Sequence, residues 1–174
     1  TQINDVLLTA LVVSLGDWIG TETVLIDLEG HGREELFADV DLSRTVGWFT
    51  SMFPVKLQLS SEDIGEALKS IKEQLRQIPE RGIGYGILRY LSPDKNIRIQ
   101  LAALPKAEIS FNYLGQFNSS QFQKVVWQTT RDLTGPNQSI QGNRTHLLGI
   151  NSLIAEGQLQ IIWTYNSCIH KDTT

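Results

Sequence analysis

The residues best suited to chemistry in this sequence lie together at positions 29–34, which read EGHGRE. These positions hold two carboxylates, an imidazole and a guanidinium, interrupted by two glycines. Glycine adopts backbone angles that a Cβ forbids, and it lets another group approach closely. An apolar run comes directly before. We therefore interpret the segment as a strand end that presents ionisable groups at a turn.

Alternation along the preceding strand predicts which way Glu29 points. Successive side chains of a strand lie on opposite faces, so Val24, Ile26 and Leu28 share one core-like face. Asp27 and Glu29 share the other, towards solvent, a cleft or a second sheet. A carboxylate in a site poor in water has a raised proton affinity, so it can act as an acid or base near neutral pH.

The residue types alone also allow structural roles for this segment. Glu29 could form a salt bridge with Arg33 or another cation, and Glu34 is expected to pair with Arg33 or to be solvated. His31 could be an acid, a base or a metal ligand. No second His, Cys or Asp set lies at ligand spacing around it, so no metal site is predicted. We expect His31 to orient the turn through hydrogen bonds.

Hydrophobic periodicity predicts an α/β fold with a mixed sheet and few helices. Gly16 is expected to end the first helix, with Asn4 as a possible cap, and Pro79 should end the second helix at Ile78. Pro54 is typical of an edge strand. The predicted helices are residues 3–15 and 60–78, and the predicted strands are residues 24–29, 53–59, 97–99, 108–113, 147–154 and 158–165, the last two forming a hairpin around Glu156 and Gly157.

Two turn-rich stretches interrupt these elements. Residues 81–86 carry glycines at alternate positions, which could cradle a phosphate, but neither the dinucleotide-binding spacing nor the Walker lysine is present. A tight crossing after the second helix is the favoured interpretation. Residues 134–143 are polar and rich in turn formers, so they are predicted to be a surface loop.

Composition narrows the class of protein. The 174 residues fit a single domain, 41% of them are hydrophobic, and the net charge of −4 shows no basic stripe for nucleic acid. No apolar run approaches the roughly 20 residues that span a bilayer. The lone Cys168 cannot form an internal disulfide, which fits a reducing compartment. We therefore expect a cytoplasmic protein that binds neither nucleic acid nor membrane.

Four ordered segments resemble one known family. EGHGRE is followed by RTVGWFTSMFPV at residues 44–55, and DVLLTA precedes it at residues 5–10. PERGIGY at residues 79–85 and FNYLGQ at residues 111–116 come later in the chain. In this order they resemble the epimerization domains of nonribosomal peptide synthetases, within the condensation-domain superfamily.

The resemblance implies a chloramphenicol-acetyltransferase-like fold of two lobes, with an HHxxxDG motif in the first lobe. This chain has only His31, His146 and His170, and no two are adjacent. Residues 1–174 therefore resemble the C-terminal lobe alone. The chain opens on Thr1 and ends on a polar tail, so we expect it to be a piece of a larger polypeptide.

The resemblance also implies a reaction. Such domains convert the L-aminoacyl or peptidyl thioester on a carrier protein to the D form, by removing and returning the Cα proton without a cofactor of their own. The substrate is carried on the phosphopantetheine arm of the carrier protein. Glu29 matches the catalytic glutamate, which faces the histidine of the missing lobe across a tunnel. This chain alone is therefore expected to be inactive.

Two neighbouring residues of the late motif are further candidates. The resemblance places Tyr113 near the tunnel, where a phenol could donate to an enolate oxygen or relay a proton. A half-buried aromatic with a backbone-bonded hydroxyl is the structural alternative. Asn112 points to the opposite strand face, so it lines or supports the tunnel together with Tyr113 only if the strand is bulged. His31 is the remaining candidate for tunnel support.

The other nucleophiles and bases match no motif of the family. His146 and His170 are predicted to be surface or edge residues, and Cys168 to be a small apolar residue rather than a nucleophile. Two other functions stay open: the C-terminal lobe of a condensation domain, which forms amide bonds, and a non-catalytic docking lobe. The expected partners are a peptidyl carrier protein, the N-terminal lobe and, through the lobe interface, a second copy of the chain.

Overall fold

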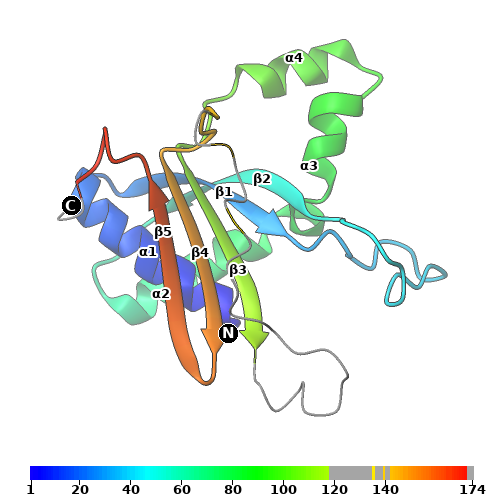
Figure 1. The fold of residues 1–174 in the computed structure, drawn as a ribbon. Coiled ribbons are helices and arrows are strands. Elements are labelled where there is room, and N and C mark those ends of the chain that lie inside the picture. The colour runs from blue at the N-terminus through cyan, green and yellow to red at the C-terminus, as the bar shows by residue number, and fades with distance from the viewer. Residues whose placement is uncertain (118–134, 136–138, 140–141, 172–174) are drawn as a thin grey trace.

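The fold is a five-stranded mixed sheet with two helices packed on one face, in a computed structural model that describes residues 1–117, 135, 139 and 142–171 (Figure 1). The strand order is β2-β1-β3-β4-β5. The outer pairs β1–β2 and β4–β5 are antiparallel, and the inner pairs β1–β3 and β3–β4 are parallel. The strands are β1 Thr23–Gly30, β2 Ser51–Gln58, β3 Ile109–Phe117, β4 Leu148–Ala155 and β5 Gln158–Tyr165. The predicted α/β class with a mixed sheet and flanking helices is confirmed.

The core lies between the sheet and helices α1 (Ile3–Ile19) and α2 (Ile64–Arg76). The alternation predicted for β1 is confirmed, because Val24, Ile26 and Leu28 are buried in this core. The strand's other residues lie on the opposite face, which we call the Glu29 face. Burial of the apolar face drives the strand to this register, since a slip by one residue would expose every core side chain.

Helix α1 is longer than predicted. Gly16 does not end it, because the helix continues to Ile19 and Gly20 takes the left-handed conformation with φ 74°. The N–H of Gly20 donates to the Gly16 carbonyl at 2.8 Å. A Cβ on Gly16 would lie 2.9 Å from the Thr21 carbonyl oxygen, so this glycine makes room for the returning chain. The N-cap is Gln2 rather than Asn4.

The predicted strand at residues 97–99 is wrong. These residues belong to helix α4 (Lys95–Ala103), whose N-cap Asp94 accepts a hydrogen bond from the N–H of Asn96 at 2.8 Å. Two isoleucines two residues apart imitate a strand pattern, but a capping aspartate three residues earlier favours a helix. Helix α2 likewise starts later than predicted, after the N-cap Asp63, and ends at Arg76 rather than Ile78.

Short helical turns lead from α2 to α4. They are the 3₁₀ turn η1 (Pro79–Gly82), α3 (Gly84–Gly86) and the π-helical turn η2 (Ile87–Leu91). Gly82 has φ 81°, and a Cβ there would lie 2.3 Å from the Phe53 ring. The glycines thus serve a tight crossing, as favoured from the sequence. Residues 84–103, which we call the helical arm, extend away from the sheet on the side of β2 (Figure 1).

The remaining predictions divide by strand position. Pro54 lies on β2, an edge strand, as predicted. The β4–β5 hairpin is confirmed, with Glu156 and Gly157 at positive φ in its turn. This backbone matches the tight turn that hairpins favour. The predicted polar loop at residues 134–143 lies largely outside the described residues.

Candidate functional site

Glu29 lies near the end of β1 on the face of the sheet opposite α1 and α2. Its Oε2 accepts a hydrogen bond from Asn112 Nδ2 at 2.8 Å. Asn112 comes from β3, which pairs with β1 in parallel so that Leu28 is opposite Phe111. The next residue of each strand then faces the other side of the sheet, and this register brings Glu29 and Asn112 together across 83 positions of sequence.

The environment of Glu29 changes its acidity. Burial raises the pKa of the Glu29 carboxyl above its ordinary value of 4.5, and the positive charge of His146 lowers it by a smaller amount. A carboxylate with a raised pKa is a stronger base than one in free solution, so Glu29 is suited to accept a proton. The Asn112 amide fixes one carboxylate oxygen and leaves the other for chemistry.

His146 is a second site residue, which the sequence did not predict. Its Nε2 lies 2.8 Å from Asp27 Oδ2, and its Nδ1 lies 3.0 Å from Thr145 Oγ1. The His146 side chain is 11% exposed and that of Asp27 is 21% exposed. The prediction of a surface or edge histidine is therefore wrong, because the chain entering β4 folds this ring onto the Glu29 face. The only signal in the sequence was Asp27, which alternates onto the same face as Glu29.

The predicted Arg33 ion pairs are absent from the described contacts. The Arg33 guanidinium donates to the carbonyl oxygens of Leu42 at 3.0 Å and Gly47 at 3.2 Å, and it lies over the Phe49 ring. Arg33 thus holds residues 31–50, which we call the long loop, rather than a carboxylate. A Cβ on Gly32 would lie 1.6 Å from the Phe49 carbonyl oxygen, which explains the glycine.

His31 and Glu34 form a separate group at the start of the long loop. Nδ1 of His31 accepts a hydrogen bond from the Arg33 N–H at 2.9 Å, and its Nε2 lies 3.3 Å from Glu34 Oε1. Glu34 also pairs with Arg81 at 3.6 Å. The prediction that Glu34 pairs with Arg33 or is solvated is wrong, because the turn aims it at His31 and η1. These are the contacts of a histidine that orients a turn.

Tyr113 lies on the opposite side of the sheet from Glu29. Ile109, Phe111 and Tyr113 alternate on the helix face, and Tyr113 is partly buried against the core. The register shift in β3 occurs after Tyr113, between it and Gln116, so Asn112 keeps the ordinary alternation. The structure therefore brings Asn112, and not Tyr113, to Glu29.

A second concave region lies on the helix face. A pocket of about 420 Å³ is lined by residues of α1, β5 and the C-terminal segment, among them Trp18, Trp163 and His170. The His170 ring lies 5.8 Å from that of Trp18 and 6.4 Å from that of Tyr165. Its Nε2 is buried and has no hydrogen-bond partner among the described residues. The prediction of an ordinary surface residue is thus wrong for His170 as well, since these rings cover it. Cys168 is exposed.

Two kinds of feature are absent from the described residues. No group of three His, Cys, Asp or Glu side chains there is placed to hold a metal ion. No helix in that part of the chain is both long and apolar enough to cross a membrane.

The comparisons with known proteins agree on one family. The family described as "Condensation domain" matches residues 1–174. One protein of the linear gramicidin synthase of Brevibacillus parabrevis is 52% identical over 174 residues, covering 99% of this chain and 2% of that protein. Gramicidin S synthase 1 of Brevibacillus brevis is 42% identical over 182 residues, covering 100% of this chain and 16% of that protein.

Solved structures show the same fold. The epimerization domain from the third module of tyrocidine synthetase B has a TM-score of 0.83 and 42% identity, covering 96% of this chain and 36% of that chain. The first condensation domain of the CDA synthetase has a TM-score of 0.57 and 16% identity, covering 97% and 35%. The chain thus spans a small part of these relatives. It belongs to the condensation-domain family of nonribosomal peptide synthetases.

Proposed function

We propose that this chain is the C-terminal lobe of an epimerization domain and that Glu29 is one of its two acid/base groups. The carrying observation is a half-buried carboxylate with a raised pKa, fixed by the Asn112 amide on the Glu29 face. The similarity to a solved epimerization domain over nearly the whole chain supports the proposal. Similarity to condensation domains is much lower in sequence and supports the fold alone.

The proposed reaction inverts the Cα of an aminoacyl or peptidyl thioester. The Glu29 carboxylate takes the Cα proton, and the electron pair of the C–H bond moves into the thioester carbonyl to give an enolate. A proton returned to the other face of Cα completes the inversion. Because the two faces need groups on opposite sides, a second acid/base is required, and we assign it to the other lobe of the domain.

The geometry divides the work between the two oxygens of Glu29. Oε2 accepts the Asn112 amide hydrogen at 2.8 Å, so that oxygen is already engaged. Oε1 is then the oxygen that faces the proton. The hydrogen bond also restricts rotation of the carboxylate, which lowers the entropy cost of reaching the reactive geometry.

The substrate in this proposal comes from a partner. A peptidyl carrier protein presents the thioester on its phosphopantetheine arm, and the N-terminal lobe closes the tunnel. Tyr113 is not given a role at the Cα proton, because it packs on the other side of the sheet. This lobe alone is expected to invert nothing.

A stereochemical assay tests the proposal. A two-lobed domain containing this chain is incubated with an L-aminoacyl carrier protein, and the amino acid is released and separated on a chiral column. We expect D product with the wild type and at least a hundredfold slower inversion with Glu29→Gln, since a positioned base contributes about 10²- to 10⁴-fold. Glu34→Gln is the matched control, because Glu34 pairs with His31 and Arg81 instead. Equal rates for Glu29→Gln and wild type would contradict the proposal.

A condensation-domain lobe is the second candidate. It is favoured by the family match, which carries the description "Condensation domain" over residues 1–174. The same two-lobed protein is therefore offered a second, acceptor aminoacyl carrier protein. Peptide formation without any D product would favour this candidate over the first.

A further inference from the structure

We propose that His146, anchored by Asp27, is a positioning residue that keeps the Glu29 carboxylate ionised inside its water-poor site. This inference deepens the proposed function, because it assigns the support of the same carboxylate. Neither residue belongs to the segments that carry the family resemblance. The assignment comes from their place on the Glu29 face.

The starting point is a pair of carboxylates that repel each other. Asp27 and Glu29 are two residues apart on β1, so their side chains leave the same face with Cα atoms about 7 Å apart. Like charges at such a distance in a half-buried site disfavour double ionisation. Burial alone also acts against the ionised form of Glu29. A carboxylate intended as a base at neutral pH needs a compensating positive charge.

His146 is placed to supply that charge. Its Nε2 lies 2.8 Å from Asp27 Oδ2 and its Nδ1 lies 3.0 Å from Thr145 Oγ1. A carboxylate and a hydroxyl oxygen can both accept hydrogen bonds, so both ring N–H groups of an imidazolium are satisfied. The ring is 11% exposed, and a charge so placed is screened much less than a surface charge.

The same contacts exclude a direct catalytic role for His146. Both nitrogens are already engaged, so neither is free to exchange a proton with a substrate. The ring acts on Glu29 through its charge, which lowers the pKa of Glu29 against the larger opposing effect of burial. His146 is therefore a positioning residue in the sense that it sets the charge state of another group.

The other charged or titratable groups around this pair come from two directions. From α3, Tyr85 has a pKa raised by burial, with smaller contributions from Tyr90 and Asp27 among others. From the segment before β4, the Arg144 guanidinium donates to the carbonyl oxygens of Thr164 and His146. Among the described residues, His146 is the cation whose charge acts on Glu29 by the largest amount.

The test is a carboxyl titration of Glu29 by ¹³C NMR in this chain, with the signal assigned by Glu29→Gln. In His146→Gln the titration midpoint of Glu29 should rise by about half a unit or more, because a nearby charge typically shifts a pKa by this amount. His31→Gln is the matched control, since His31 pairs with Glu34 and should leave the midpoint unchanged. An unchanged midpoint in His146→Gln overturns the inference.

A charge-preserving variant separates charge from packing. His146→Arg should keep the Glu29 midpoint near that of the wild type, whereas His146→Gln should not. Equal shifts in both variants would mean that the ring acts by packing, which overturns the inference. If His146→Gln fails to fold, the ¹⁵N shifts of the His146 ring in the wild type decide. The ring should be an imidazolium over the pH range in which Glu29 ionises, and a neutral ring there overturns the inference.

These titrations use no substrate, so they stand even if the domain proves to have another activity. In an active two-lobed domain, ionised Glu29 is required as base, so the acidic limb of the rate profile follows its pKa. His146→Gln should move that limb to higher pH and leave the plateau rate within about threefold. A loss of rate that is the same at every pH would contradict a role through the Glu29 charge.

Discussion

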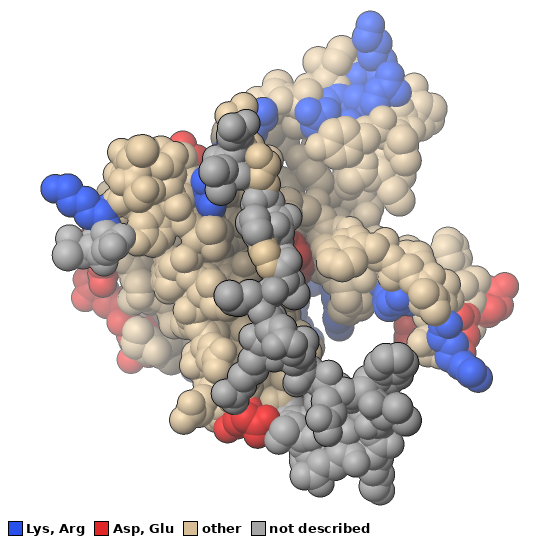
Figure 2. All heavy atoms as spheres, in the orientation of Figure 1, with Lys and Arg blue, Asp and Glu red and all other residues tan. Residues whose placement is uncertain are grey.

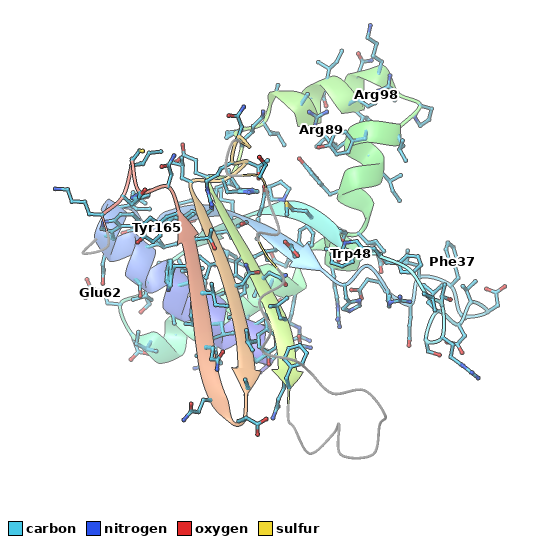
Figure 3. The ribbon with its side chains drawn as sticks, in the orientation of Figure 1. Phe37, Trp48, Glu62, Arg89, Arg98 and Tyr165 are labelled. Carbon is cyan, nitrogen blue, oxygen red and sulfur yellow. The ribbon has the colours of Figure 1, made fainter. Side chains whose placement is uncertain are left out.

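The sheet and the segments that leave it use their side chains in opposite ways. On β1, β3 and the entry to β4, polar groups are paired across strands: Glu29 with Asn112, and Asp27 with His146. On the long loop and the helical arm, large apolar side chains face outwards. Val46 is 98% exposed and Trp48 is 90% exposed, and Figure 3 shows Trp48 and Phe37 on the long loop.

The difference separates a self-contained site from surfaces without cover. Register and burial fix the Glu29 group within this lobe, whereas Tyr90 and Leu91 on the helical arm are more than two-thirds exposed. Lys and Arg side chains gather on the same arm (Figure 2), among them Arg89 and Arg98 (Figure 3). Exposed apolar groups of this size mark surfaces that contact another body.

The largest expected effect on stability lies in the sheet. Ile26→Ala removes a fully buried side chain from β1 and should lower the free energy of unfolding by about 3 kcal/mol. Trp48→Ala, a larger truncation on the long loop, should change it by less than about 0.5 kcal/mol. Chemical denaturation of both variants measures the contrast. Similar losses would mean that the loop belongs to the core.

The next effect concerns the support of Glu29. Asn112→Ala removes the amide that donates to Oε2 and should slow inversion in a two-lobed domain by about tenfold, since a hydrogen bond to a charged group contributes about 1.5–3 kcal/mol. Its matched control is Asn151→Ala on β4, another half-buried asparagine on the same face of the sheet. Equal rates for the two variants would show that Asn112 does not support Glu29.

A smaller effect should appear in the pH dependence of stability. Because burial raises the pKa of Glu29 above 4.5, the folded state keeps its proton to higher pH than the unfolded chain. Below pH 4.5 the carboxyl is neutral in both states, and as pH rises through the folded pKa the wild type loses stability.

Glu29→Gln should therefore gain stability over the wild type between about pH 4 and pH 7. Urea unfolding at several pH values measures this difference. Glu62→Gln, on an exposed side chain, is the control and should show no such trend. A gap that narrows as pH rises would contradict the raised pKa of Glu29.

The uncovered surfaces lead to the weakest prediction in energy. The lobe should associate with itself at high concentration through its exposed apolar side chains, and Val46→Ser with Trp48→Ser should weaken this while leaving the unfolding midpoint nearly unchanged. Light scattering over a concentration series measures the effect. A chain that stays monomeric throughout would contradict it.

Local patterns predicted the parts of the fold that depend on neighbours in sequence. The alternation in β1 and the Glu156-Gly157 turn of the β4–β5 hairpin needed only a few consecutive residues. The same local reasoning misread Gly16, where a glycine inside α1 makes room for a distant backbone. It also misread residues 97–99, where the cap at Asp94 outweighed a short apolar alternation.

The site was less accessible, because its contacts are set by strand order. Glu29 was predicted from the segment around it, but its partner Asn112 lies 83 positions away, and His146 lies 119 positions from Asp27. Which strands neighbour β1, and in which direction, decides both contacts. For the same reason, alternation along β3 showed that Asn112 and Tyr113 lie on opposite faces but could not say which of them meets Glu29.

The most direct test follows the Cα proton itself. A two-lobed domain containing this chain is mixed in D₂O with an aminoacyl thioester on its carrier protein, and deuterium at Cα is measured by mass spectrometry within one turnover. We predict rapid incorporation by the wild type and a loss of at least a hundredfold in Glu29→Gln, with Glu34→Gln near wild type. Incorporation at an undiminished rate in Glu29→Gln would contradict the claim that Glu29 handles this proton.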